Sequence, residues 1–327
     1  MPTPGLSPDL TADQDPSVFI STTFFPGADI NPHLSDLVLS SSDSVLFYVH
    51  AHILLASSDN GFNSLLPFTS DNRLSRFHTG ENHIAVAEDS SSLNIVLHNS
   101  YDISSAQYSP SFETLVSAVV SLHTYGISLD RCLVPSTPLY NSLLSHAPLR
   151  PLELYILAAS YDRYELAVST SSHLLSFTLS SLTDDMVDKM GAKYLKRLFF
   201  LHFGRTSALK RLLLPPPHPH APTNSCSFSD QKSVSRAWAL VAAYLAWDAR
   251  PDMSTHTIKT ALCSLEEQVD CDICRTSLNE RIRDLVIQWS LIKVSISLTF
   301  LGNSAPYEYF GHPCRTLLNR LMHAPRI

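Results

Sequence analysis

Residues 35–67 (SDLVLSSSDSVLFYVHAHILLASSDNGFNSLLP) constrain the fold more than any other stretch of this 327-residue chain. The runs 36–39 and 45–50 predict two strands, the second from its alternating pattern, and the polar residues 40–44 favour a turn between them. After His50, the apolar residues 53–56 follow without glycine or proline, which predicts the start of a buried helix. The stretch therefore predicts a strand–turn–strand–helix unit of a small α+β module.

This stretch resembles the opening of a BTB/POZ domain. In that family an Asp precedes the first strand, the second strand reads Phe-x-Val-His, a Leu stands four residues after the His, and a Ser and a Phe follow. The residues that carry the likeness are Asp36, Phe47, Val49, His50, Leu54, Ser58 and Phe62. The resemblance implies that the fold and the dimer interface are built from Asp36, Phe47, Val49, His50, Leu54 and Phe62.

Later stretches extend the resemblance. Tyr101 ends a predicted helix, and residues 123–127 (HTYGI) close another, as in BTB domains, so that the likeness covers residues 30–131. Residues 226–252 and 271–290 are similar to the helical region that follows the domain in BTB proteins of basidiomycete fungi. The resemblance implies a homodimer that recruits other proteins, either as an adaptor for cullin ubiquitin ligases or in transcription.

The pattern divides the chain into an α+β domain and an all-α domain. We predict a disordered N-terminus at 1–17, a BTB/POZ-like domain at 18–135, an α-helical domain at 150–294 and a tail at 295–327. Prolines mark the boundary between the two domains, and the run PPPHPHAP at 215–222 predicts an extended linker. Apolar spacing predicts a strand at 83–87 and helices at 93–101, 112–126, 152–168, 184–190, 193–214, 230–245, 257–269 and 275–293.

Composition excludes several classes of partner. Charged residues make up 16% of the chain and the net charge is −7, so the chain lacks the basic excess with which nucleic-acid-binding proteins neutralise phosphates. Its apolar runs are shorter than the roughly eighteen residues that a membrane-spanning helix needs. The six cysteines and an N-terminus without a signal-peptide pattern predict an intracellular protein with reduced thiols, in the cytoplasm or the nucleus.

Motifs of catalysis are missing from the sequence. The nine glycines stand singly, and the chain contains no G-x-G-x-x-G, no phosphate-binding loop, no G-x-S-x-G and no H-E-x-x-H. His50 could act as a base, but a His at a strand–helix junction favours a structural, hydrogen-bonded role. We therefore expect no enzyme activity and no cofactor.

The pair Cys271 and Cys274 is the one constellation in the sequence that a metal could use. A C-x-x-C lets two thiolates reach one tetrahedral Zn²⁺, and the residues that could complete such a site are Cys226, Cys263, His218 and His220. Two small buried cysteines at a helix start explain the pair better, and the His-Pro-His run favours a solvated spacer. The sequence therefore predicts no metal, with Cys271, Cys274, Cys226 and Cys263 as the candidates if one binds.

These observations together predict a protein-binding module rather than an enzyme. We expect a homodimer formed through residues 18–25 and 36–55 that acts as a scaffold or adaptor for unidentified proteins, a cullin among the candidates. Direct binding of nucleic acid or membrane is not expected. The alternatives are a transcription-linked regulator and a zinc-stabilised structural protein. A helical stripe, read either as core or as a partner-binding face, consists of Val234, Trp238, Val241 and Leu245.

Overall fold

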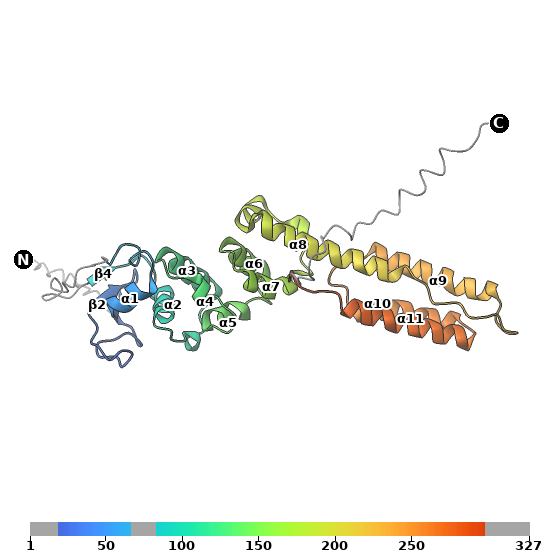
Figure 1. Cartoon of the computed structure of the whole chain (residues 1–327), viewed down its shortest axis with the longest axis horizontal. Helices are drawn as coiled ribbons and strands as arrows, with labels where there is room; N and C mark the ends of the chain where they lie inside the picture. Colours follow the sequence, from blue (N-terminus) through green and yellow to red (C-terminus); the bar gives the residue numbers. More distant parts are fainter. Residues whose placement is uncertain (1–18, 67–82, 298–327) are drawn as a thin grey trace, which may run out of the picture. The chain divides into compact units, whose positions relative to one another are not determined.

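The computed structural model describes residues 19–66 and 83–297 (Figure 1). It confirms an α+β architecture in which a small mixed sheet with short helices lies near the N-terminus and a largely helical region follows. The predicted disorder at 1–17 and the part of the tail beyond residue 297 lie outside the described residues. In the described part of the chain, no helix is both long enough and apolar enough to cross a membrane.

The sheet has four strands in the order β1-β3-β2-β4. The predicted strand–turn–strand unit forms its centre, because β2 and β3 pair in antiparallel fashion with Leu37 opposite Val49. The turn is closed by the Ser41 hydroxyl, which accepts a hydrogen bond from the Val45 amide. The outer strands both pair in parallel with their neighbours. The strand bounds are β1 (Phe19–Ile20), β2 (Leu37–Ser40), β3 (Val45–Val49) and β4 (His83–Ala85).

Helices with well-defined caps follow the sheet. Asp89 accepts a hydrogen bond from the Ser92 amide and Ser111 from the Thr114 amide, which satisfies backbone donors at two helix starts. The helices near the sheet are α1 (Ala51–Ser57), α2 (Ser90–Ser100), η1 (Ala106–Tyr108), α3 (Phe112–Thr124), α4 (Leu129–Cys132) and α5 (Pro138–Ser145). The next are α6 (Pro151–Ser160), α7 (Tyr164–Ser171), η2 (Ser172–Leu174) and η3 (Leu179–Ser181).

Two stretches differ from the sequence prediction. The proline-rich boundary contains helices α4 and α5, because Pro138 and Pro151 occupy first-turn positions where a missing amide hydrogen costs nothing. The single helix predicted at 152–168 is two helices. The chain breaks at Asp162, whose φ of 53° is incompatible with a continuing right-handed helix.

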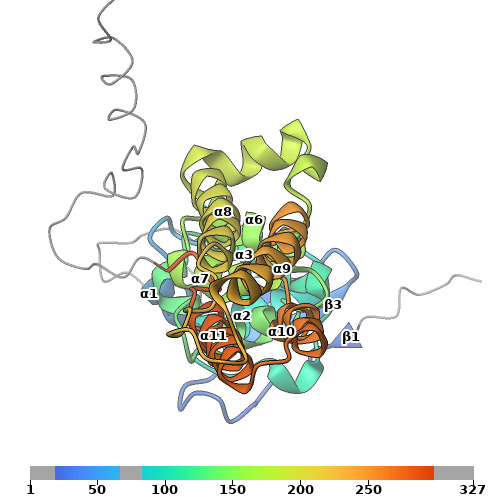
Figure 2. The ribbon, with the colours of Figure 1, turned by 90° about the vertical axis from the view of Figure 1, so that its right-hand side faces the viewer.

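The last helices pack around one another, as the end-on view in Figure 2 shows. Gly191, with a φ of 70°, kinks the longest of them. The bounds are α8 (Asp184–Leu213), α9 (Phe228–Trp247), α10 (Thr255–Cys263), η4 (Ser264–Gln268) and α11 (Asp272–Ser290).

Buried apolar side chains form two cores that divide within α8. The first core runs from Phe24 through the sheet and helices α1–α7 to Leu201, and it also contains Ile296, which follows α11 in the chain. The second begins at Leu209 and contains the inner faces of α9, α10 and α11. The sequence instead marks a boundary at its prolines near 135–150, where the described core continues without a break. Pro138 and Pro151 start helices, whereas Pro135 and Pro148 lie in turns, and the predicted domain boundary stays a prediction.

Buried Arg205 lies between the two cores. Its guanidinium donates hydrogen bonds to the carbonyls of Pro251, Ile292 and Lys293 at 2.7–2.9 Å. It also stacks 4.3 Å from the ring centroid of Trp289. A charged donor thus satisfies the carbonyl of Pro251 before α10 and those of Ile292 and Lys293 after α11, which joins α8 to the chain on both sides of α10 and α11.

Gly126 closes α3 and supplies a stability test. Its φ is +69°, and a Cβ there would lie 2.6 Å from the Asn60 side chain and 2.9 Å from the Asn60 amide nitrogen. We predict that Gly126→Ala lowers the free energy of unfolding by about 2–4 kcal/mol, from strain plus overlap. Gly27 has a φ of +79° with open space around it, so Gly27→Ala should cost only about 1 kcal/mol. Equal losses in urea unfolding would contradict the role assigned to Asn60.

Candidate metal centre

The chain between α8 and α9 turns sharply just before α9 begins. Thr223 and Cys226 exchange two backbone hydrogen bonds of 3.0 and 3.3 Å. Ser227 then caps α9, and its partner Asp230 completes a reciprocal capping box. Because the tight turn and the cap fix the backbone on both sides of it, Cys226 is held at the N-terminal end of α9, where it is buried.

The C-x-x-C pair lies at the start of α11. Cys271 is the N-cap residue and Cys274 occupies the first turn, so that both sulfurs face the same end of the helix. A helix N-terminus offers free amide hydrogens and a partial positive charge, which favour thiolates. The Cys274 sulfur lies 3.8 Å from the Cys226 sulfur, so the N-terminal ends of α9 and α11 meet at this point.

His220 completes the cluster from the proline-rich linker. Its Nδ1–H donates a 2.7 Å hydrogen bond to the Ala221 carbonyl, and its backbone amide donates to the Gln231 side chain at 3.2 Å. This leaves the Nε2 lone pair directed at the thiols, 3.4 Å from the Cys271 sulfur and 3.2 Å from the Cys274 sulfur. A carbonyl that fixes the tautomer and the ring orientation is the usual outer-shell partner of a metal-binding histidine.

The spacing of the four ligand atoms fits a tetrahedral zinc site. All four lie within 4.8 Å of one another. With Zn–S bonds of about 2.3 Å and a Zn–N bond of about 2.0 Å, a tetrahedron has S···S edges of about 3.8 Å and S···N edges of about 3.5 Å. The distance from the Cys226 sulfur to the Cys274 sulfur is 3.8 Å, and His220 Nε2 lies 3.4 Å from the Cys271 sulfur and 3.2 Å from the Cys274 sulfur, with every remaining pair within 4.8 Å. One ion at the centre would therefore reach every ligand with small shifts.

The thiols differ in their acidity. Backbone amides at the start of α11, that of Cys274 foremost, lower the pKa of the Cys271 thiol to about 7. Burial raises the pKa of Cys226 and, to about 12, that of Cys274. Cys271 thus ionises near neutral pH, whereas its two neighbours hold their protons unless a cation replaces them.

Two of the residues considered from the sequence lie elsewhere. Cys263 ends α10 and does not join the four-ligand group. His218 is exposed, and its carbonyl accepts a hydrogen bond from the Ser277 hydroxyl. The solvated-spacer interpretation therefore fails for His220, although it fits the side chain of His218.

His50 lies in a different environment, at the junction of β3 and α1. Its Nδ1 and its backbone amide both contact the Tyr101 hydroxyl at 2.8 Å, and its Nε2 contacts the His33 carbonyl at 2.8 Å. Burial raises the pKa of Tyr101. Since both ring nitrogens are engaged, His50 has no free lone pair with which to act as a base or a metal ligand.

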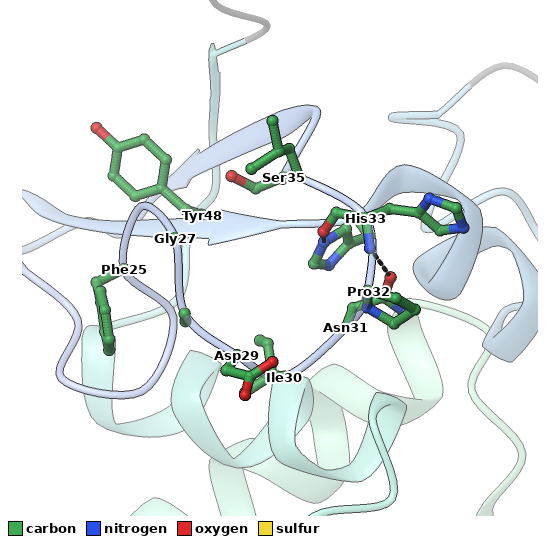
Figure 3. A pocket seen from close by; sticks show the side chains of 12 residues that line it. Phe25, Gly27, Asp29, Ile30, Asn31, Pro32, His33, Ser35 and Tyr48 are labelled. Atoms are coloured by element: carbon green, nitrogen blue, oxygen red, sulfur yellow. Dashed lines mark hydrogen bonds between the residues drawn. The ribbon is translucent and has the colours of Figure 1, made fainter.

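The cavity beside His50 is small. It measures about 240 Å³ and is lined by the loop 27–35 together with Phe25, Tyr48 and His50 (Figure 3). Pockets that bind small molecules usually exceed about 300 Å³ and converge several polar groups on the ligand. Here the loop closes a ring around the cavity, with Asn31 accepting the His33 amide hydrogen. This arrangement favours a folded loop over a substrate site.

The other residues of the BTB-like pattern belong to the first core. Asp36 accepts a hydrogen bond from the Ala51 amide at the start of α1. Phe62 stacks on Tyr125 with ring centroids 4.0 Å apart. The remaining three, all buried, are Phe47, Val49 and Leu54. The structure thus places these residues where they support the fold, and their predicted place in a dimer interface stays a prediction.

Comparison of the chain with protein-family models, with curated proteins and with solved structures finds no match. The assignment of a function therefore depends on the geometry of the chain itself.

Proposed function

We propose that the protein is a non-catalytic protein-binding scaffold whose C-terminal helices are joined by one structural zinc ion. The ligands are the sulfurs of Cys226, Cys271 and Cys274 and the Nε2 atom of His220. The observation that carries the proposal is the near-tetrahedral spacing of these four atoms, all within 4.8 Å of one another. This proposal replaces the prediction, made from the sequence, that the chain binds no metal.

The donor set favours zinc and a structural role. Three thiolates and one imidazole are soft ligands that suit Zn²⁺ and not Mg²⁺ or Ca²⁺, which prefer oxygen. Catalytic zinc sites keep one position open for water, but here protein atoms supply all four positions. Cys226 and Cys274 are buried, which limits access of a substrate to the ion.

Zinc would join three segments that are far apart in the sequence. The linker 215–222 has no helix or strand of its own. An ion held by His220, Cys226 and the start of α11 would fix that linker against two helices at once. Cross-linking His220 to Cys271 and Cys274 through an ion closes the loop of chain between them. This removes conformational freedom mainly from the unfolded chain, which stabilises the folded state.

The sheet region supports association as the second part of the proposal. We propose that it is a BTB/POZ-like module that forms homodimers and recruits other proteins, as a cullin adaptor or in transcription. The supporting observation is edge strand β1, whose side chains Phe19 and Ile20 are 61% and 50% exposed. Exposed apolar groups on a strand at the edge of the described sheet favour pairing with another chain.

Metal analysis tests the zinc site. We predict about one zinc per chain purified without chelators, because the four ligands form a single closed site. Cys226→Ser, Cys271→Ser, Cys274→Ser and His220→Ala should each bind much less zinc. At free zinc a thousandfold above Kd, the ion should add about 4 kcal/mol to the free energy of unfolding.

The matched controls for this test are Cys263→Ser and His218→Ala, which alter the same residue types outside the cluster. Both should keep wild-type zinc content in equilibrium dialysis with plasma mass spectrometry. Wild-type protein without bound zinc, or equal zinc in ligand and control variants, would contradict the site. Circular dichroism establishes that each variant is folded.

Sedimentation velocity tests association through β1. Replacing two exposed apolar side chains by charges at a paired edge should weaken the pairing, so Phe19→Asp/Ile20→Asp should lower the average mass at a given concentration. Leu34→Asp is the control, because Leu34 is also exposed but lies outside the strand. A mass unchanged by the double variant would remove β1 from the interface.

A further inference from the structure

Helix α9 has two apolar faces, and only one of them packs inside the molecule. Trp238 and Leu245 of the predicted stripe are 1% and 2% exposed and lie in the second core, which decides in favour of the core interpretation. On the opposite side Leu240, Tyr244 and Trp247 are 74%, 68% and 92% exposed. Such a row of large exposed apolar side chains on one helix marks an interaction surface.

The exposed residues follow the spacing of a coiled-coil seam. Positions 233, 236, 240, 243 and 247 are separated by alternating steps of three and four, and all of them are exposed. They are Ser233, Arg236, Leu240, Ala243 and Trp247, with Tyr244 beside them, and we call them the α9 outer face. This spacing places the side chains along one line that a second helix can cover.

The α9 outer face is complementary to the outer face of a second copy that runs in the opposite direction. Large side chains then lie against small ones, and cations lie against aromatic rings. In an antiparallel pair with the two-fold axis between residues 240 and 243, Leu240 of one copy lies against the small Ala243 of the other. The same pairing places Arg236 against the second copy's Trp247, a cation–π contact that occurs twice. A parallel pair would instead set Arg236 against Arg236, which repels.

We propose that the α9 outer face binds the same face of a second copy of the chain as an antiparallel, two-fold symmetric helix pair. Aromatic side chains bury about 150–250 Å² each. Tyr244 and Trp247 therefore supply about 300–500 Å² of the roughly 800 Å² per partner of a standard interface, and Leu240 and the stem of Arg236 add to that area. This surface is separate from β1 and from the proposed zinc site.

A swap of the paired residues tests the arrangement directly. The experiment uses the full chain with Phe19→Asp/Ile20→Asp, so that association through β1 does not contribute, and sedimentation velocity up to about 100 µM. Leu240→Glu and Trp247→Arg should each weaken association at least about tenfold, since central aromatic and apolar contacts dominate such interfaces. The double variant Arg236→Trp/Trp247→Arg restores both cation–π pairs and should return association to within about threefold of the parent.

Leu149→Glu is the matched control, because Leu149 is exposed on another part of the chain and should change nothing. Trp247 gives a second readout. Trp238 and Trp289 are buried, so a blue shift of tryptophan emission with rising protein concentration reports burial of Trp247. A parent that stays monomeric, or association that Leu240→Glu leaves intact, overturns the proposal. Failure of the swap to restore association overturns the antiparallel pairing.

Discussion

Three sulfurs and one imidazole nitrogen meet where α9 and α11 begin, and the proposed zinc ion would join the C-terminal helices at this point. Three thiolates this close would repel one another strongly, while burial opposes ionisation of Cys226 and Cys274. A divalent cation would offset both the repulsion between the thiolates and the cost of ionising buried thiols, because it replaces the protons and attracts the thiolates. The same ion would set the position of a linker that has no backbone ladder of its own.

The linker is held by side chains from α11 as well. Ser277 donates to the His218 carbonyl, and Arg281 donates to the carbonyls of Pro215 and Leu212. A proline-rich run contains few amide hydrogens, so the carbonyls in it need hydrogen-bond donors from other segments. These contacts bring His220 to the start of α11, which explains how a proline-rich run can supply a ligand.

Much of the fold follows from local patterns in the sequence. An apolar run predicts β2, alternation predicts β3, and apolar spacing predicts α3, α9, α11 and, as two helices, α8. The sequence pattern does not predict the helices at 129–145. Its prolines indicate a break in helical structure, although proline is also compatible with the first turn of a helix. The pattern also does not predict the division of the cores, because the contacts that decide it are between residues distant in sequence.

The candidate site could be predicted only in part. The C-x-x-C spacing identifies Cys271 and Cys274 as possible partners of one ion, since both fall in one helical turn. The choice of Cys226 over Cys263, and of His220 over His218, depends on how α9 and α11 pack and on the turn at Thr223. A single sequence carries no local signal for those long-range contacts.

The two faces of α9 give the helix two roles in this account. Its inner face and its N-terminal end hold the helical region together, whereas its outer face presents aromatic groups to another chain. Charge and side-chain size on the outer face vary along the helix, which distinguishes a specific surface from scattered exposed apolar residues. The sheet and α9 would then provide separate surfaces for association.

The most direct test of the central claim is X-ray absorption at the zinc K edge of the full chain loaded with one equivalent of zinc. We predict a four-coordinate ion with three sulfur neighbours near 2.3 Å and one nitrogen near 2.0 Å, both about the usual bond lengths. A first shell made of oxygen and nitrogen alone, or one with fewer than three sulfurs, would contradict it.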